Sequence, residues 1–145
     1  VWSARKPRGK RFGSPPTAFG HGVLIQPLLH RLTRIGVDIG SVHVRPKSIV
    51  TVAKKEADVK VIRGMTKSWP WAIAGDWCLD HPAGPGIRAT PVVDTVKSDG
   101  GANSRVDAVF IGGKIGAGKS RKIDPGTLSD HYWLDVELII GGSTL

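Results

Sequence analysis

Several short stretches of the chain have the residue pattern of β-strands. Residues 132–140 alternate, 36–44 are rich in β-forming residues, and 105–111 are mostly apolar with Asp107 interrupting the run. A fourth, 72–75, is continuously apolar and ends at a glycine that is followed by Asp76. An apolar run bounded by Gly and Pro is typical of a buried strand. The pattern therefore predicts strands that carry polar side chains at or near their ends.

One segment has the periodicity of a helix instead. In residues 48–67 the apolar positions share one face, while Lys and Glu occupy the other. These apolar positions are Val52, Ala53, Val59, Ile62 and Met65. Ser48 is the expected N-cap of this helix. Together with a further short strand at 91–96, this order of elements predicts the α+β class, with a mixed β-sheet and one main helix.

The remaining segments have weaker patterns. Residues 1–22 are rich in Arg, Lys, Gly and Pro, which favours a basic arm that can include an edge strand. Residues 23–32 suit a strand or a short helix, although Pro27 disfavours both. Residues 112–129 are Gly- and Lys-rich and are expected to form a loop. We therefore expect an irregular basic segment over 1–35 and a folded domain over 36–145.

The composition and net charge of the chain indicate which class of partner it binds. The chain has 145 residues, 40% of them hydrophobic, which fits one domain with its own core. Its 21 Lys and Arg residues exceed 12 acidic residues, so a formal charge of +9 favours nucleic acid or another phosphate ester as partner. No apolar stretch approaches the length of a membrane span. The single cysteine excludes an intrachain disulfide, and no Cys/His spacing of a zinc motif is present.

A phosphate-binding loop pattern is present in residues 113–120, which read G-K-I-G-A-G-K-S. That motif binds phosphate only where a helix begins at its Lys-Ser pair. Pro125 and Gly126 would end such a helix within two turns. A loop whose lysines contact phosphate as plain charges is the favoured alternative.

Polar residues at the strand ends form a candidate site. They are His43, Asp76, Asp107 and the pair Asp130 and His131. Each alone is more often structural than catalytic. Jointly they supply carboxylates for a divalent cation, imidazoles that exchange protons near pH 7, and a carboxylate to orient one imidazole. This inventory suits metal-assisted hydrolysis of a phosphoester.

Four ordered motifs resemble those of the endonuclease/exonuclease/phosphatase superfamily, which has the deoxyribonuclease I-like fold. They are V-H-V-R-P at 42–46, A-G-D-W-C-L-D-H-P at 74–82, R-V-D-A-V-F-I at 105–111 and S-D-H-Y at 129–132. The resemblance covers about residues 36–140 and only the second half of the family's domain. It implies half of an αββα sandwich. It also implies a phosphodiesterase or nuclease that uses Mg²⁺ or Mn²⁺ and acts on nucleic acid, DNA included, or another phosphoester.

The resemblance also implies a role for each site residue. His43 would stabilise charge on the scissile phosphate, and Asp76 would hold the attacking water or the metal. Asp107 would bind His131, which would act as general base or phosphate ligand, and Asp130 would help to bind the cation. Basic residues of the arm and the loop would contact the substrate backbone, namely Arg5, Lys6, Arg8, Lys114, Lys119, Arg121 and Lys122.

Two departures from the family pattern support an alternative function. Cys78 stands where the family has Asn, and a thiol is a poor ligand for magnesium. No match is found for the family's metal-binding Glu, which belongs to the first half of its domain. A catalytically impaired module that binds nucleic acid or phosphate is therefore the alternative. Because one sheet alone would leave an apolar face in water, we also expect an N-terminal half, another chain or a second copy to cover it.

Overall fold

The computed structural model of the chain describes residues 1–12, 21–45, 51–66, 70–78, 87–90, 106–141 and 143–144. The elements in chain order are β1 (Trp2–Ala4), β2 (Arg8–Arg11), β3 (Gly22–His30), β4 (Gly36–His43), α1 (Val52–Met65), β5 (Trp71–Asp76), β6 (Ile87–Thr90), β7 (Asp107–Gly112), β8 (Ile115–Ile123), the 3-10 turn η1 (Gly126–Leu128), β9 (Trp133–Ile140) and β10 (Ser143–Thr144).

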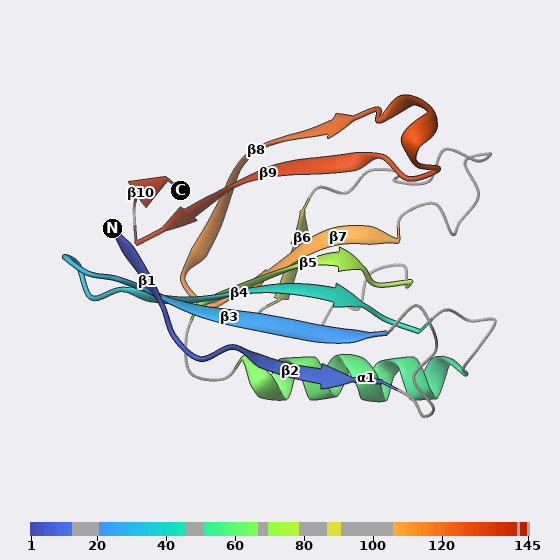
Figure 1. Cartoon of the computed structure of the whole chain (residues 1–145), viewed down its shortest axis with the longest axis horizontal. Coiled ribbons are helices and arrows are strands. Elements are labelled where there is room, and N and C mark those ends of the chain that lie inside the picture. Colours follow the sequence, from blue (N-terminus) through green and yellow to red (C-terminus); the bar gives the residue numbers. More distant parts are fainter. Residues whose placement is uncertain are drawn as a thin grey trace.

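The strands form two sheets. The larger sheet has the order β1-β3-β4-β5-β7-β6, and β2 also pairs with β3. Within it β4 and β5 are parallel, and α1 connects them, whereas the other pairs are antiparallel. The smaller sheet has the order β10-β9-β8. Figure 1 shows α1 below the larger sheet and the β8–β9 hairpin above it. The predicted α+β class, with a mixed sheet and one main helix, is confirmed.

A hydrophobic core lies on each face of the larger sheet. On the helix side, Val59 and Ile62 of α1 pack with Ile25 and Ile73 of the sheet. On the other side, Ile111 of β7 packs in a second core with Ile115 and Ile140 of the smaller sheet, and with Val37 and Ala72. The molecule therefore has three layers, one of helix and two of sheet.

This second core corrects one expectation. We expected the face of the sheet away from the helix to find no cover within the chain. The smaller sheet covers it in part, with Val136 and Leu138 of β9 packed against the core. The cover is incomplete at the other end of the face, where Leu24 is 58% exposed. A partner chain or second copy over this face stays a prediction.

Most predicted elements are confirmed, with shifted boundaries. The stretches 36–44, 72–75, 105–111 and 132–140 correspond to β4, β5, β7 and β9. The helix begins at Val52 after Thr51 as N-cap, and Ala53 is exposed, although we placed it on the buried face. The predicted cap Ser48 and the strand at 91–96 lie outside the described residues.

The N-terminal segment belongs to the sheet, so the expected boundary at residue 35 does not separate two structural units. Both β1 and β2 pair with β3, and residues 5–7 interrupt this edge opposite Pro27. The Pro27 carbonyl accepts a hydrogen bond from the Arg5 N–H at 2.9 Å, so the Pro27 nitrogen also faces this edge. The edge strand is interrupted at the point where Pro27 has no N–H to donate. This position explains how β3 accommodates a proline in its interior.

The prediction of a loop over 112–129 is wrong. Residues 115–123 form β8, which pairs with β9 in an antiparallel hairpin with an irregularity between Ala117 and Ser120. Lys119 and Ser120 therefore lie within a strand and start no helix, which excludes the phosphate-binding loop. No helix in the described part of the chain is long and apolar enough to cross a membrane.

A buried ion pair ties the edge strand to the interior. Asp38 of β4 is 1% exposed and binds the guanidinium of Arg8 on β2. The same guanidinium donates from Nη1 to the carbonyl of Met65, at 2.7 Å, in the last turn of α1. Helix C-termini leave carbonyls without intrahelical partners, and a cation is favourable there. Arg8 thus joins β2, β4 and α1.

Replacing Arg8 should therefore destabilise the fold strongly. Arg8→Ala leaves the carboxylate of Asp38 buried without its cation, which costs about 3–5 kcal/mol of unfolding free energy. Urea denaturation of the variant measures this loss. Lys10→Ala, an exposed position on the same strand, is the matched control and should change stability by less than about 0.5 kcal/mol. A loss for Arg8→Ala as small as that of the control would contradict the structural role of the pair.

Candidate active site at the strand ends

Three site residues lie at the same edge of the larger sheet. His43 is the last residue of β4, Asp76 is the last of β5, and Asp107 is the first of β7. The register pairs His43 with Asp76 and Asp76 with Asp107. Because β4 and β5 are parallel and β7 is antiparallel to β5, these ends meet in one row. The sheet thus sets the three side chains next to one another.

Gly75 allows β5 to approach β4 closely at this edge. Its φ is +142°, and a Cβ at this position would lie 2.0 Å from the carbonyl oxygen of Val42. Only glycine fits there, which explains the Gly-Asp order of the motif. The following residue, Trp77, is buried and donates its indole N–H to the Ala108 carbonyl at 3.2 Å. Asp76 is therefore fixed on both sides.

His131 reaches the row from the other sheet. It lies just before β9, and its Nδ1 is 2.5 Å from Oδ2 of Asp107. Its backbone N–H donates to the Ser129 hydroxyl at 3.0 Å. One possible ligand atom each from Asp76, Asp107 and His131 lies within 4.8 Å of the others. The structure thus brings together residues separated by 55 positions of the sequence, as the motifs predicted.

A second group of donor atoms shares Asp76. His43 Nε2 is 3.9 Å from Asp76 Oδ2, and Cys78 completes a set whose donor atoms lie within 4.8 Å of one another. The backbone N–H of Cys78 donates to Asp76 Oδ1 at 2.7 Å. Cys78 has φ of 48°, a conformation that few residues other than glycine adopt. Its side chain is thereby turned into the neighbourhood of His43 and Asp76.

His21 is a site neighbour that the sequence pattern did not indicate. Its ring packs against that of His43, with centroids 4.5 Å apart and planes tilted by 52°, and His21 is 8% exposed. Burial, the neighbouring His43 and then Arg45 lower the pKa of His21, while Asp76 opposes them. The signal that could have found it is the hairpin of β3 and β4, which pairs Gly22 with His43.

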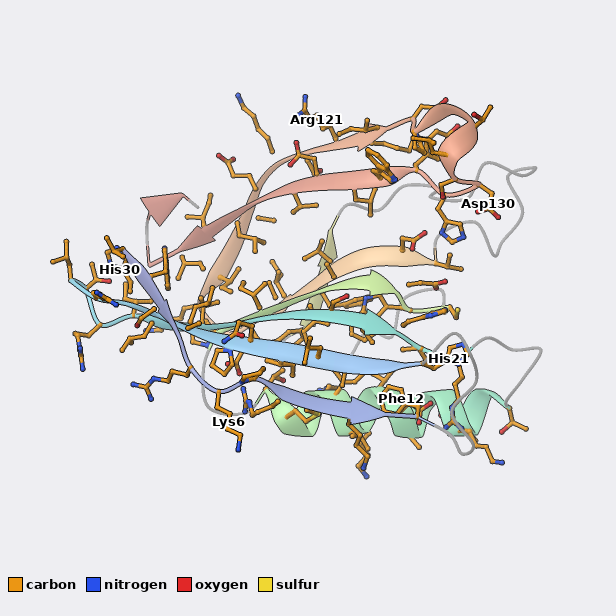
Figure 2. The ribbon with its side chains drawn as sticks, viewed as in Figure 1. Lys6, Phe12, His21, His30, Arg121 and Asp130 are labelled. Atoms are coloured by element: carbon orange, nitrogen blue, oxygen red, sulfur yellow. The ribbon has the colours of Figure 1, made fainter. Side chains whose placement is uncertain are left out.

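Asp130, the other predicted metal ligand, is exposed and belongs to neither group of donor atoms among the described residues. Figure 2 shows it on the segment between η1 and β9, at the same end of the molecule as His21. Its role as a metal ligand stays a prediction.

The predicted basic contacts are distributed over both sheets, and their role in substrate binding stays a prediction. Figure 2 shows Lys6 and Arg121 at opposite margins of the molecule, both away from Asp130. Arg121 pairs with Asp135 at 2.8 Å, and Lys122 lies over the ring of Tyr132, 4.2 Å from its centroid. Arg5, Lys114 and Lys119 are exposed, while Arg8 is held by Asp38.

Comparison with solved structures identifies the fold. The catalytic domain of human Nocturnin with bound sulfate has a TM-score of 0.71 at 12% identity, over 96% of this chain and 60% of that one. A protein of the endonuclease/exonuclease/phosphatase family from Leptotrichia buccalis gives 0.68 at 16% identity, over 94% and 62%. D. rerio TDP2 in complex with a single-stranded DNA product gives 0.65 at 12%, over 90% and 66%.

The chain has the endonuclease/exonuclease/phosphatase fold. No family model matches the sequence, and no curated protein matches it. The chain spans 60%, 62% and 66% of the lengths of the three solved chains. This share is consistent with a partial domain of the endonuclease/exonuclease/phosphatase fold, as the motifs predicted.

The pKa of His21 predicts how stability depends on pH. In the unfolded chain His21 takes up a proton near pH 6.5, whereas in the folded chain its lowered pKa delays uptake to lower pH. Acidification below pH 6.5 therefore favours the unfolded state, and the stability present above pH 6.5 is lost as pH falls.

The measurement is the urea midpoint between pH 7.5 and 5.5, in buffer with a chelator. His21→Gln removes the titrating group and should reduce the loss of stability on acidification. An identical pH dependence in the variant and the unchanged chain would contradict this account.

Proposed function

We propose that this chain forms part of a divalent-metal-dependent phosphodiesterase or nuclease whose substrate is nucleic acid. The observation that carries the proposal is the hydrogen bond of 2.5 Å between His131 and Asp107, with Asp76 beside them. A carboxylate that orients an imidazole next to a second carboxylate is an arrangement for proton transfer. The fold shared with the Nocturnin catalytic domain and with TDP2 bound to a DNA product supports the same reaction class.

In this proposal His131 is the general base. Asp107 engages its Nδ1, so Nε2 is the nitrogen that accepts a proton from the attacking water. Its side chain is 32% exposed, so solvent reaches the ring. As the phosphorus–oxygen bond to the leaving group breaks, charge develops on the phosphoryl oxygens. The imidazole of His43, 44% exposed at the end of β4, is placed to stabilise that charge.

The donor atoms at the site fit a divalent cation. Asp76 and Asp107 provide two carboxylates within 4.8 Å, and carboxylate oxygens are ligands that Mg²⁺ and Mn²⁺ accept. Such a cation, when bound, would neutralise charge on the phosphate. Asp76 is 23% exposed and fixed by Gly75 and Trp77, which suits it to hold an ion at the sheet edge.

The alternative is a module of the same fold that binds nucleic acid or phosphate without turnover. Cys78 favours it, because a thiol is a much weaker hydrogen-bond donor to a phosphate oxygen than the asparagine amide of the family motif would be. Binding to an oligonucleotide that weakens steeply with salt, without cleavage, would favour this alternative.

Removal of the general base should abolish most hydrolysis. With purified chain, Mg²⁺ or Mn²⁺ and a labelled oligonucleotide, His131→Ala should reduce turnover about 10²–10⁴-fold. A chelator should remove the activity of the unchanged chain. His30→Ala is a matched control because His30 lies at the opposite end of the molecule from His21 (Figure 2). Undiminished cleavage by His131→Ala, or cleavage insensitive to the chelator, would reject the mechanism.

Restoring an amide beside Asp76 should raise activity. Asn tolerates the left-handed backbone of position 78 and can donate to a phosphate oxygen, so Cys78→Asn should increase turnover about tenfold or more. Steady-state kinetics with the same oligonucleotide measure this change. Cys78→Ala removes the thiol without adding a donor and should give no gain. An equal gain in both variants would show that the thiol only obstructs the site.

A further inference from the structure

The group made by His43, Asp76 and Cys78 has a different chemistry from the pair of carboxylates. It offers one imidazole nitrogen, one carboxylate oxygen and one sulfur, all within 4.8 Å of one another. Mg²⁺ takes oxygen ligands almost exclusively, whereas Zn²⁺ takes sulfur, nitrogen and oxygen. No spacing in the sequence marks this set, because its members come from β4 and from the turn after β5.

The distances allow zinc after a small side-chain adjustment. Zinc bonds are about 2.0–2.2 Å to nitrogen and oxygen and about 2.3 Å to sulfur, so two tetrahedral N or O ligands lie about 3.3–3.6 Å apart. His43 Nε2 and Asp76 Oδ2 are 3.9 Å apart, so they must approach each other by about 0.5 Å to share one ion. Asp76 Oδ1 is taken by the Cys78 N–H, which leaves Oδ2 toward His43.

The other group of donors is less suited to a soft cation. In that group His131 and Asp107 bind each other at 2.5 Å, so the imidazole already has its partner. His43 and Asp76, at 3.9 Å, are too far apart for a hydrogen bond. A cation between them would coordinate both His43 Nε2 and Asp76 Oδ2.

His21 lies beside this group. It is 8% exposed, and its ring packs against that of His43 with centroids 4.5 Å apart and planes tilted by 52°. This packing restricts the orientation of the His43 imidazole next to Asp76.

We infer that His43, Asp76 and Cys78 form a zinc site, with the fourth position open to water. On binding, the thiol of Cys78 loses its proton to solvent and the thiolate coordinates the ion. The inference goes beyond the proposed function and does not depend on turnover. A chain that binds zinc without hydrolysing a phosphoester would support the site and reject only the enzyme.

The test is metal binding by the full chain after dialysis against a chelator. Titration with Co²⁺ should give one equivalent per chain and a thiolate-to-cobalt charge-transfer band in the near ultraviolet. Competition with a chromophoric chelator then gives the zinc dissociation constant, which excess Mg²⁺ should raise less than about tenfold, because Asp76 is the one ligand that the two ions would share. The readout is spectroscopic, so it is independent of any assay of activity.

The variants separate this site from other zinc-binding groups. Cys78→Ser and His43→Ala should each raise the zinc dissociation constant about 100-fold or more, because removal of even an outer partner of a ligand costs 10–100-fold. His30→Ala should change it less than about threefold. Figure 2 shows His30 at the end of the molecule opposite His21. Zinc affinity equal in the unchanged chain and Cys78→Ser, or lost equally in His30→Ala, would overturn the inference.

Two further measurements keep the result interpretable if a variant folds poorly. Circular dichroism of each metal-free variant establishes that it is folded. Cys78→Asn is a second variant without a thiolate, and asparagine accepts the backbone conformation of that position. It should lose zinc as Cys78→Ser does. Retention of tight zinc binding by a folded Cys78→Asn chain would also overturn the site.

Discussion

The parallel pairing of β4 with β5, closed by Gly75, is the constraint on which the site depends. A side chain at position 75 would collide with the Val42 carbonyl, so glycine alone lets the two strands stay in register to their ends. That register sets His43 beside Asp76, and the pairing of β5 with β7 adds Asp107. The chemistry at this edge therefore follows from backbone geometry, and side-chain packing then holds each group in place.

Each of the two cores stabilises a different part of the site at this edge. The helix-side core buries Trp77, whose indole N–H binds the Ala108 carbonyl and fixes the turn that carries Asp76 and Cys78. The core on the other face holds the smaller sheet against the larger one. His131 can reach Asp107 only because that smaller sheet is docked there. Site formation thus requires all three layers, even though no site residue belongs to the helix.

Asp76 belongs to both groups of donor atoms, which suit different cations. Its carboxylate faces the Asp107–His131 pair, which suits proton transfer beside a hard cation, and it also faces His43 and Cys78, which suit a softer one. His21, whose ring is tilted against that of His43, adds a buried imidazole beside the second group. The thiol changes which metal the edge prefers without disturbing the register that builds it.

The local residue pattern was sufficient to predict β4, β7, β9 and the helix, and the strand-end motifs predicted the meeting of Asp76, Asp107 and His131. It failed for β8, because exposed Gly and Lys residues resemble a loop until their pairing with β9 is known. The burial of Asp38 against Arg8, and the nearness of His21 and Cys78 to His43, depended on the tertiary structure alone. Alternation along one strand is a property of neighbouring residues, whereas register, layer packing and burial are set by segments distant in sequence.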